Sequence, residues 1–440
     1  MTRALPIATA VLAAALALIY LPDIGHGFVK DDFRWIDVGR LASLADLPRL
    51  LAADVGFYRP LVLASFGVNY ALSGLHAFPF ALTNLLLLVA CAALIARLAS
   101  TFDLSPAAAL LAAAAWAFNF RAVSMALLWI SGRTALFLTL FALLATLATL
   151  RQHRWRAAGW CLLALLSKEE AVVLPFFLAG WVAWSSQSES RWRDALRHTW
   201  PMGVALGTYA ILRSTSQAFG PFTAPSYYRF NFEPAHLLRN VGEYLDRSST
   251  VAVALALIVV IACRQLPALD ERERRGLAFS VAWLISGFAI TVFLPLRSDL
   301  YALAPSVGSC VALGVVASAL ERRQKTGLRR TLAALALLPV LLLPIYRARN
   351  ARWVRPADLS TQVLRDLQDA ARITPLGAHV VLIDAPSERT TLDNAFESLI
   401  PDAGRLIGLR QVDIVADGPV SPDATDVFRL ADGRLVRASR

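Results

Sequence analysis

Two adjacent carboxylates, Asp31 and Asp32, follow a long apolar run near the start of the chain. The run from Leu5 to Leu21 is long enough to cross a bilayer as a helix that rises about 1.5 Å per residue. The carboxylates are therefore predicted just outside a membrane. A carboxylate that lies among basic groups can remove a proton from a hydroxyl group while the cations stabilise negative charge.

Further charged residues from distant parts of the chain are predicted at the same side of the membrane. Taken singly, each is explained as a loop charge that headgroups solvate. Charges at a membrane edge are costly, however, and they tend to face a cavity. Lys168 follows a short apolar helix, which would draw it into the protein. The set consists of Lys30, Asp31, Asp32, Arg34, Arg59, Arg133, Lys168, Glu169, Glu170, Arg297, Asp299 and Tyr301.

One carboxylate with two or three cations suits the transfer of a group from a phosphate-linked donor. A lipid phosphate leaves without a general acid because its oxygen is a weak base, so the reaction needs a base for the acceptor and cations for the growing charge. Neighbouring carboxylates need not share a role, and the sequence leaves open whether Asp31 or Asp32 is the base. No cofactor is assigned. A divalent metal is left open, with His26 as the nearest histidine.

The composition identifies a polytopic membrane protein. Hydrophobic residues make up 57% of the 440 residues, charged residues only 17%, and the mean hydropathy is +0.54. The net charge of +11 comes from basic residues in short loops, which membrane topology explains, so no nucleic-acid partner is implied. The four cysteines all fall within apolar runs and are expected in the core.

Alternation of apolar runs and arginine clusters predicts about eleven spans, with the N-terminus cytoplasmic and the C-terminal region outside. The transmembrane domain is assigned to residues 1–346, with a first external loop at 22–77. Apolar residues three and four apart predict an interfacial helix over 38–52, and a second amphipathic stretch follows at 58–75. A long external loop is predicted over 213–248.

Residues 347–440 are polar and are predicted to form a small extracytoplasmic α/β domain. Residues 380–384 read as a strand, and 404–415 contain another alternating stretch. Residues 427–436 read as a hairpin with Asp432-Gly433 at the turn.

Several short motifs stand in a fixed order over residues 1–355. They are Phe28-Val29-Lys30-Asp31-Asp32, Tyr58-Arg59-Pro60-Leu61, Asn69–Leu75, Thr83–Leu86, Trp129-Ile130-Ser131-Gly132-Arg133, Leu166-Ser167-Lys168-Glu169 and Leu300-Tyr301 with Pro305–Gly308. In this order they resemble the GT-C glycosyltransferases. The resemblance is to the branch that contains the protein O-mannosyltransferases and the transmembrane tetratricopeptide-repeat O-mannosyltransferases, although no repeats follow the last span here.

The resemblance implies an inverting glycosyltransferase that moves a sugar, mannose in those relatives, from a polyprenyl-phosphate donor to an acceptor hydroxyl. It implies a base from the acidic pair, with Asp31 ahead of Asp32, and donor phosphate held by Arg59, Lys168 and Arg297. Residues expected to support the site are Arg133, Glu169 and Tyr301. The chain reads Arg297-Ser298-Asp299-Leu300-Tyr301 where those relatives commonly show Glu-Arg-Tyr-Leu-Tyr.

The acceptor is a protein, a glycan or a lipid, and the expected location is a bacterial inner membrane. The alternative is a transporter or flippase of lipid-linked sugars. A transporter predicts internal repeats and charges near the middle of the bilayer. The sequence shows neither, and its charged groups are expected at the outer edge.

Overall fold

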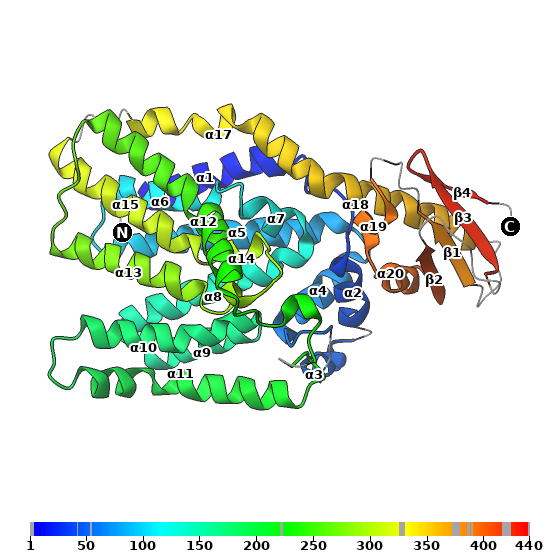
Figure 1. The fold of residues 1–440 in the computed structure, drawn as a ribbon, viewed down its shortest axis with the longest axis horizontal. Coiled ribbons are helices and arrows are strands. Elements are labelled where there is room, and N and C mark those ends of the chain that lie inside the picture. Colours follow the sequence, from blue (N-terminus) through cyan, green and yellow to red (C-terminus); the bar gives the residue numbers. More distant parts are fainter. Residues whose placement is uncertain are drawn as a thin grey trace.

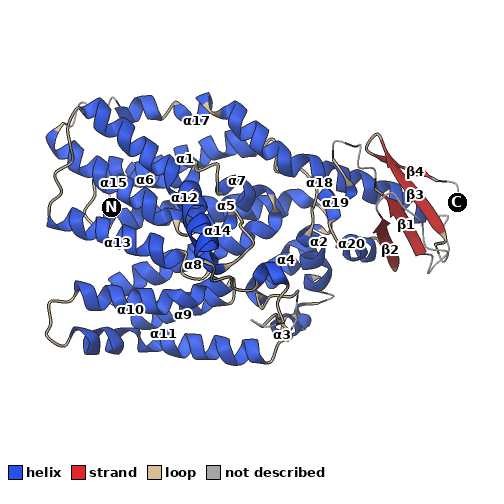
Figure 2. Ribbon diagram, in the orientation of Figure 1, coloured by secondary structure: helices blue, strands red, loops and turns tan. Residues whose placement is uncertain are grey.

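A computed structural model of the chain describes residues 4–41, 43–52, 55–220, 223–324, 331–371, 379–384, 388, 390–415 and 424–438. Helices run side by side along the long axis of the molecule, and a small sheet domain projects from one end (Figure 1). The described strands are confined to that domain (Figure 2). The molecule is thus an α-helical membrane bundle with a small C-terminal α/β domain, as predicted.

Four described helical segments are long and apolar enough to cross a membrane, and a bent pair at 331–341 and 343–370 makes a fifth. Several other helices are apolar but shorter, so about eleven spans stays a prediction. The bundle helices are α1 (Ala4–Tyr20), α5 (Ala77–Ser100), α6 (Pro106–Ala117), α7 (Val123–Leu128), α8 (Arg133–Leu150), α9 (Arg154–Leu165), α10 (Leu174–Ser185), α11 (Arg191–Ser214), α12 (Pro234–Cys263), α13 (Glu271–Gly287), α14 (Leu300–Leu303), α15 (Ser306–Arg323), α17 (Leu338–Leu341) and α18 (Leu343–Ala371).

Several of these helices begin at residues that favour a helix N-terminus. Pro106 and Pro234 occupy the first turns of α6 and α12, where a missing N–H costs nothing. The Ser105 hydroxyl accepts a hydrogen bond from the Ala108 N–H at 3.2 Å, and Asp270 with Glu273 forms a capping box on α13. Short 3₁₀ turns are η1 (Leu44–Asp46), η2 (Ile130–Gly132), η3 (Glu169–Val173), η4 (Ser226–Tyr228) and η5 (Thr291–Phe293).

The first external loop folds into short helices beside the sheet domain (Figure 1). These are α2 (Asp31–Gly39), α3 (Arg49–Ala52) and α4 (Pro60–Ser73). The single helix predicted over 38–52 is wrong, because α2 ends at Gly39 and α3 begins at Arg49. Gly39 and Gly67 let α2 and α4 approach closely, since a Cβ on Gly67 would lie 2.4 Å from the Gly39 carbonyl oxygen. This contact fixes the direction of α2.

The external loop predicted over 213–248 is shorter than expected. Helix α12 begins at Pro234, so its first half occupies positions that the sequence assigned to the loop. Hydropathy does not reveal the true start of this helix, because the helix begins with polar residues before its apolar segment. The extension brings Glu243 and Arg247 to the end of the bundle that carries the sheet domain.

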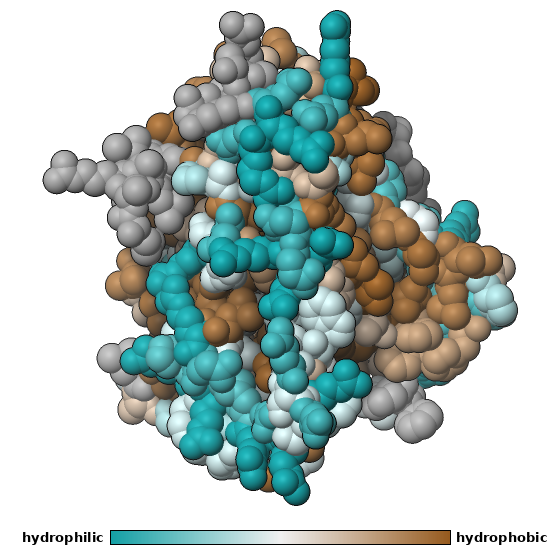
Figure 3. All heavy atoms as spheres, turned by 90° about the vertical axis from the view of Figure 1, so that its left-hand side faces the viewer, coloured by the Kyte–Doolittle hydropathy of each residue, from teal (hydrophilic) through white to brown (hydrophobic). Residues whose placement is uncertain are grey.

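The opposite end of the bundle carries many hydrophilic side chains (Figure 3). The α10–α11 and α12–α13 connections lie at this end (Figure 1). Exposed arginines belonging to or flanking these connections include Arg191, Arg193, Arg264 and Arg272. The distribution agrees with the arginine-rich side from which the sequence orientation was inferred, and the orientation itself stays a prediction.

The C-terminal domain is a four-stranded sheet in the order β2-β1-β3-β4. The central strand β1 pairs in parallel with β2 and β3, while β3 and β4 form the predicted antiparallel hairpin. Asp432 and Gly433 have φ of 51° and 74°, as a tight hairpin turn requires. The elements are β1 (His379–Ile383), α19 (Leu392–Phe396), α20 (Ile400–Leu406), β2 (Gln411–Val415), β3 (Asp426–Ala431) and β4 (Arg434–Arg437).

Helix α18 joins the two parts and extends from the bundle to the sheet (Figure 1). The boundary predicted between residues 346 and 347 falls within this helix and stays a prediction. The domain also contacts the first loop, where the Arg405 Nε donates to Asp37 at 2.8 Å. The ring of Phe396 stacks on Phe33 at 5.3 Å. The sheet domain is therefore held against the helix that bears the acidic pair.

Candidate functional site

The acidic pair forms the first turn of α2. Carboxylates are favoured there because a helix N-terminus carries partial positive charge. The preceding residue, Lys30, has φ 52° and ψ −125°, a conformation that costs free energy in a residue with a side chain. Contacts with the C-terminal domain hold it, since the Lys30 N–H donates to the Ala395 carbonyl at 2.8 Å and its ammonium pairs with Glu397 at 2.7 Å.

Asp32 is fully buried and acts as a hydrogen-bond hub. One carboxylate oxygen accepts from the backbone N–H and the hydroxyl of Ser131, at 2.7 and 2.5 Å. The other oxygen accepts from the Val29 N–H at 3.0 Å. Burial raises the pKa of Asp32 to about 7, although these hydrogen bonds oppose the rise. Its carboxylate joins the first loop to η2 and is shielded from solvent.

Asp31 has a different environment. Its side chain is half-buried, and within the described chain it forms no hydrogen bond or ion pair. Burial raises the pKa of Asp31 to about 6 and Glu397 adds to the rise, while the nearby cations Arg59, Lys30 and Arg34 lower it. Of the two carboxylates, Asp31 is the one whose oxygens are available to a hydroxyl group.

Two ion pairs form a compact group near Asp31, which we call the paired cluster (Arg59, Lys168, Glu169 and Glu170). Arg59 precedes α4 and makes two hydrogen bonds to Glu169 of η3, at 2.8 and 2.5 Å. The guanidinium also lies 4.2 Å from the centre of the Phe57 ring. Burial alone would raise the pKa of Glu169, but Arg59 outweighs it and lowers this pKa. The pair is therefore ionised.

Lys168 is the second cation of the paired cluster. Only 3% of its side chain is exposed, and its ammonium lies 2.7 Å from a Glu170 carboxylate oxygen. The ammonium also lies 4.8 Å from the centre of the Tyr301 ring. The structure thus brings together four predicted site residues, Arg59, Lys168, Glu169 and Tyr301, from separate parts of the chain. The arrangement can bind an anion where the cations exchange a carboxylate partner for a phosphate.

Arg297 lies in a neighbouring group. Its guanidinium pairs with Glu243 of α12 at 3.1 Å. Glu243 also pairs with Arg247, which in turn contacts Asp299 at 3.3 Å. Among the described residues Arg297 forms no ion pair with a member of the paired cluster, but Arg297 and Glu170 both lie close enough to Tyr244 of α12 to affect it electrostatically. The Tyr244 ring lies 6.3 Å from the Tyr301 ring.

Arg133 is fully buried at the start of α8. Its guanidinium donates to the Asn84 side chain, the Ser65 hydroxyl and the Phe80 carbonyl, at 2.9, 3.0 and 2.8 Å. It also lies 4.7 Å from the Phe66 ring centre. Its hydrogen bonds are directed at protein groups, so the geometry gives it a supporting position behind Asp32 and η2.

His26 is buried, and its Nδ1 lies 2.7 Å from the Gly27 carbonyl oxygen. Within the described residues no group of three or more His, Cys, Asp or Glu side chains could hold a metal ion.

Sequence reasoning missed a row of arginines on α18. Arg349, Arg352 and Arg355 are three residues apart and therefore lie on one side of the helix. We call them the α18 arginine cluster. The three-residue spacing just after the last apolar run was a readable signal, but these residues were assigned to the polar terminal domain.

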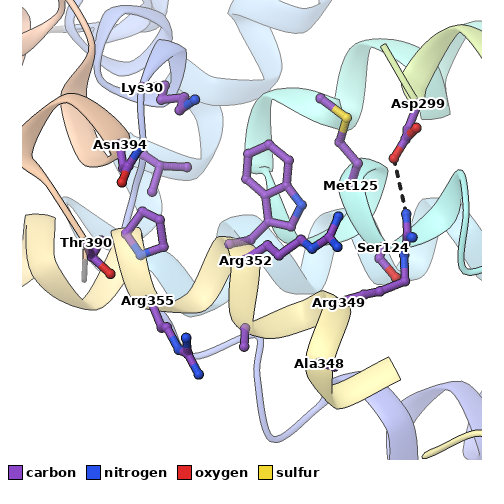
Figure 4. Close-up of a pocket in the computed structure, with 14 residues that line it drawn as sticks. Lys30, Ser124, Met125, Asp299, Ala348, Arg349, Arg352, Arg355, Thr390 and Asn394 are labelled. Carbon is purple, nitrogen blue, oxygen red and sulfur yellow. Dashed lines mark hydrogen bonds and ion pairs between the residues drawn. The ribbon is translucent and has the colours of Figure 1, made fainter. Parts of the chain in front are cut away.

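These arginines line a cavity of about 500 Å³ at the junction of the bundle and the sheet domain (Figure 4). Lys30 and Asp299 enter it from the first loop and from the start of α14, and Asn394 enters from the C-terminal domain. Arg59, Lys168 and Arg297 are not among its lining residues. The first loop thus has the paired cluster and a separate basic cavity as neighbours.

The fold of this chain is shared with solved structures of membrane enzymes of low sequence identity. The solved structures that share it include crystal structures of ArnT from Cupriavidus metallidurans. The apo form matches with a TM-score of 0.55 and 15% identity, and the form bound to undecaprenyl phosphate with 0.52 and 14%. Each alignment covers 92% of this chain and 85% of that chain. No family model and no curated protein matches the chain.

Proposed function

We propose that this protein is a membrane glycosyltransferase that moves a sugar from a polyprenyl phosphate to an acceptor hydroxyl, with Asp31 as the base. The observation that carries the proposal is the contrast within the acidic pair. Both carboxylate oxygens of Asp32 accept hydrogen bonds from Ser131 or Val29, whereas Asp31 is half-buried and forms no hydrogen bond in the described chain. The GT-C fold and the undecaprenyl phosphate bound to one structural neighbour support the donor class.

In the proposed reaction Asp31 takes the proton of the acceptor hydroxyl. The acceptor oxygen forms a bond to the anomeric carbon as the bond from that carbon to the phosphate oxygen breaks. The electron pair of the broken bond leaves with the lipid phosphate. Because the acceptor oxygen attacks the face opposite the leaving phosphate, the configuration at the anomeric carbon inverts. Arg59 and Lys168 receive the growing negative charge, because bidentate and ammonium contacts to phosphate are stronger than neutral hydrogen bonds.

The remaining predicted residues receive indirect roles. Glu169 and Glu170 neutralise the two cations before the donor arrives, Tyr301 shields Lys168, and Arg133 supports η2 behind Asp32. Arg297 acts through Glu243 and Tyr244. We place the reaction at the extracytoplasmic face of a bacterial inner membrane, with the N-terminus cytoplasmic and with mannose as the first sugar to test.

The test is transfer from radiolabelled polyprenyl-phosphate mannose to membrane acceptors by the purified full chain. We expect transfer by the wild type, loss in Asp31→Asn, and a raised donor KM in Lys168→Ala. Other polyprenyl-phosphate sugars are tried in the same assay. Full activity in both variants would remove the proposed site. Passage of lipid-linked sugar across liposomes without any transfer would favour the transporter alternative.

A further inference from the structure

The cavity beside the α18 arginine cluster has more positive charge than its neighbours neutralise. Arg349 and Arg247 share one carboxylate, Asp299, each at 3.3 Å. Arg352 and Arg355 have no ion-pair partner within the described chain. The guanidiniums around Asp299 and its acidic neighbours therefore outnumber the carboxylates. The cations are Arg121, Arg247, Arg297, Arg349 and Arg352, and the acids are Glu243, Asp246 and Asp299.

Two unused hydrogen-bond donors lie in or near the same place, one on Arg349, which lines the cavity, and one on Arg121, which does not. The Nε atoms of Arg349 and Arg121 are buried without a hydrogen-bond partner in the described structure. A buried donor that lacks an acceptor costs free energy, so a ligand rich in oxygen atoms would be favoured. Figure 4 shows Arg352 extending toward Arg349 and Asp299, whereas Arg355 points away from Lys30. Arg349 and Arg352 are thus the two arginines that can meet one anion.

An aromatic surface adjoins these donors. Trp353 lines the cavity and stacks on Trp129, with the rings 5.6 Å apart and 4° from parallel. Flat indole surfaces favour the apolar faces of sugar rings, and arginines favour carboxylate or phosphate groups. The combination indicates a sugar that carries an acidic group.

The cavity also lies next to the proposed base. Lys30 is one of its lining residues, and Asp31 follows Lys30 directly in the chain. The paired cluster, which we assign to the donor phosphate, contributes no lining residue. A molecule in the cavity therefore approaches the first loop separately from the donor phosphate group.

We propose that this cavity binds the carboxylate or phosphate group of the acceptor, so that the acceptor is an acidic glycan or glycolipid. The identification of the bound molecule as the acceptor rests on the proposed function, whereas the anion site itself does not. Arg349 and Arg352 bind the acidic group, and the hydroxyl that receives the sugar lies at Asp31.

The anion site is tested first by calorimetry on the full chain in nanodiscs of phosphatidylcholine, with glucose 1-phosphate, glucuronate and uncharged glucose as probes. We expect both acidic sugars to bind at least about tenfold more tightly than glucose. Arg352→Gln should weaken their binding about tenfold, and the Arg349→Gln/Arg352→Gln double variant should weaken it further. Arg365→Gln, an exposed arginine of the same helix outside the cavity, is the matched control and should bind like wild type.

Arg352 makes no ion pair in the described chain, so its replacement removes a charge without leaving a carboxylate unpaired, and this single variant decides the test if the double variant does not fold. Loss of binding in Arg59→Gln but not in Arg352→Gln would assign the probes to the donor site and overturn the proposal. Equal binding of glucose and the acidic sugars would also overturn it. The proposal would also be overturned if the wild-type protein kept bound phosphatidylglycerol through purification but bound neither acidic sugar, because the site would then bind a lipid headgroup.

The acceptor role is tested by transfer to octyl glucuronide and octyl glucoside, which differ in one acidic group. We expect a KM at least about tenfold lower for the glucuronide. Arg352→Gln should remove that preference and leave the donor KM unchanged. A raised donor KM, or equal loss with both acceptors, would overturn the assignment. Absence of wild-type transfer with every donor would count against the proposed function, while the calorimetry would still decide the anion site.

Discussion

In the paired cluster each cation faces its own carboxylate, whereas in the α18 arginine cluster only Arg349 has a carboxylate partner among the residues that the structure describes. The difference follows burial. Lys168 is 3% exposed, and removing a charge from water requires a nearby opposite charge. Arg352 and Arg355 are exposed, so solvent stabilises them without partners. On the proposed function, the first group exchanges one anion for another, and the second captures an anion from solution.

This contrast gives the two clusters different expected kinetics. A donor phosphate must compete with Glu169 for Arg59, so part of its binding free energy offsets a broken ion pair. An acidic group at Arg352 displaces only water and mobile ions. We therefore expect the paired cluster to control donor use and the α18 arginine cluster to control acceptor use, with Asp31 acting between them.

The largest expected effect is at Asp31, because in the proposed reaction both clusters serve the step that this carboxylate promotes. Asp31→Asn should lower kcat by about 10²–10⁴-fold, the range of general-base catalysis, with little change in thermal stability. Asp32→Asn places an amide against the Val29 N–H and should lower stability by about 1–3 kcal/mol. Transfer rate and the unfolding temperature of each variant are measured together. A kcat loss confined to Asp32→Asn, with unchanged unfolding, would reverse the two roles.

The next effect separates the clusters. Arg59→Gln should raise the donor KM about tenfold or more and leave the acceptor KM unchanged, the opposite of the pattern expected for Arg352→Gln. Arg59→Gln also leaves Glu169, whose side chain is 30% exposed, without its bidentate partner and should lower stability. The double variant Arg59→Gln/Glu169→Gln is the matched control, since it keeps the site neutral. A normal donor KM in that double variant would show that charge at Arg59 is dispensable.

A smaller effect is expected in the pH dependence. The pKa of Asp31 is raised to about 6, so the base is protonated and inactive below this pH, and kcat/KM should rise with pH through about 6 and then level off. Glu397 contributes to the raised pKa and also pairs with Lys30. Glu397→Gln should therefore move the midpoint to lower pH. Asp393→Asn removes a negative charge from the same segment and should leave the midpoint in place. An upward shift in Glu397→Gln would contradict the assignment.

The sequence predicted the composition of this site better than its internal contacts. Motif order led to Asp31, Arg59 and Lys168 as candidates, because the resemblance supplied a three-dimensional relation that spacing alone lacks, and their catalytic roles stay predictions. The structure then distinguishes Asp31 from Asp32. Neighbouring residues of a helix point about 100° apart, and which of them faces Ser131 depends on the rotation of α2. The close approach at Gly39 and Gly67 fixes that rotation, and no local pattern reveals it.

The sequence also did not reveal which hydrogen-bond and ion-pair partners the charged residues have. The sequence grouped Arg133 with Lys168, yet Arg133 is held by Asn84, Ser65 and Phe80. Glu243 lies within the predicted loop, and its position on a helix facing Arg297 follows only from the start of α12 at Pro234. The spacing of Arg349, Arg352 and Arg355 could have been read as one helix side, but only the fold places these residues around the same cavity as Lys30. Hydropathy locates membrane segments and leaves the pairing of polar groups to tertiary packing.

The smallest expected effect is the response to salt, and it compares the clusters directly. In salt of physiological strength the interaction between exposed charges decays over about 8–10 Å, because mobile ions screen it. Buried pairs are screened much less. Raising NaCl from about 0.05 to 0.5 M should therefore weaken glucuronate binding several-fold and change the donor KM by less than about twofold. In Arg352→Gln the salt dependence of glucuronate binding should flatten, because the screened charge is gone, and in Arg365→Gln it should persist. A donor KM more sensitive to salt than glucuronate binding would mean that the paired cluster opens to solvent before the donor binds, and the contrast between exchange and capture would then fail.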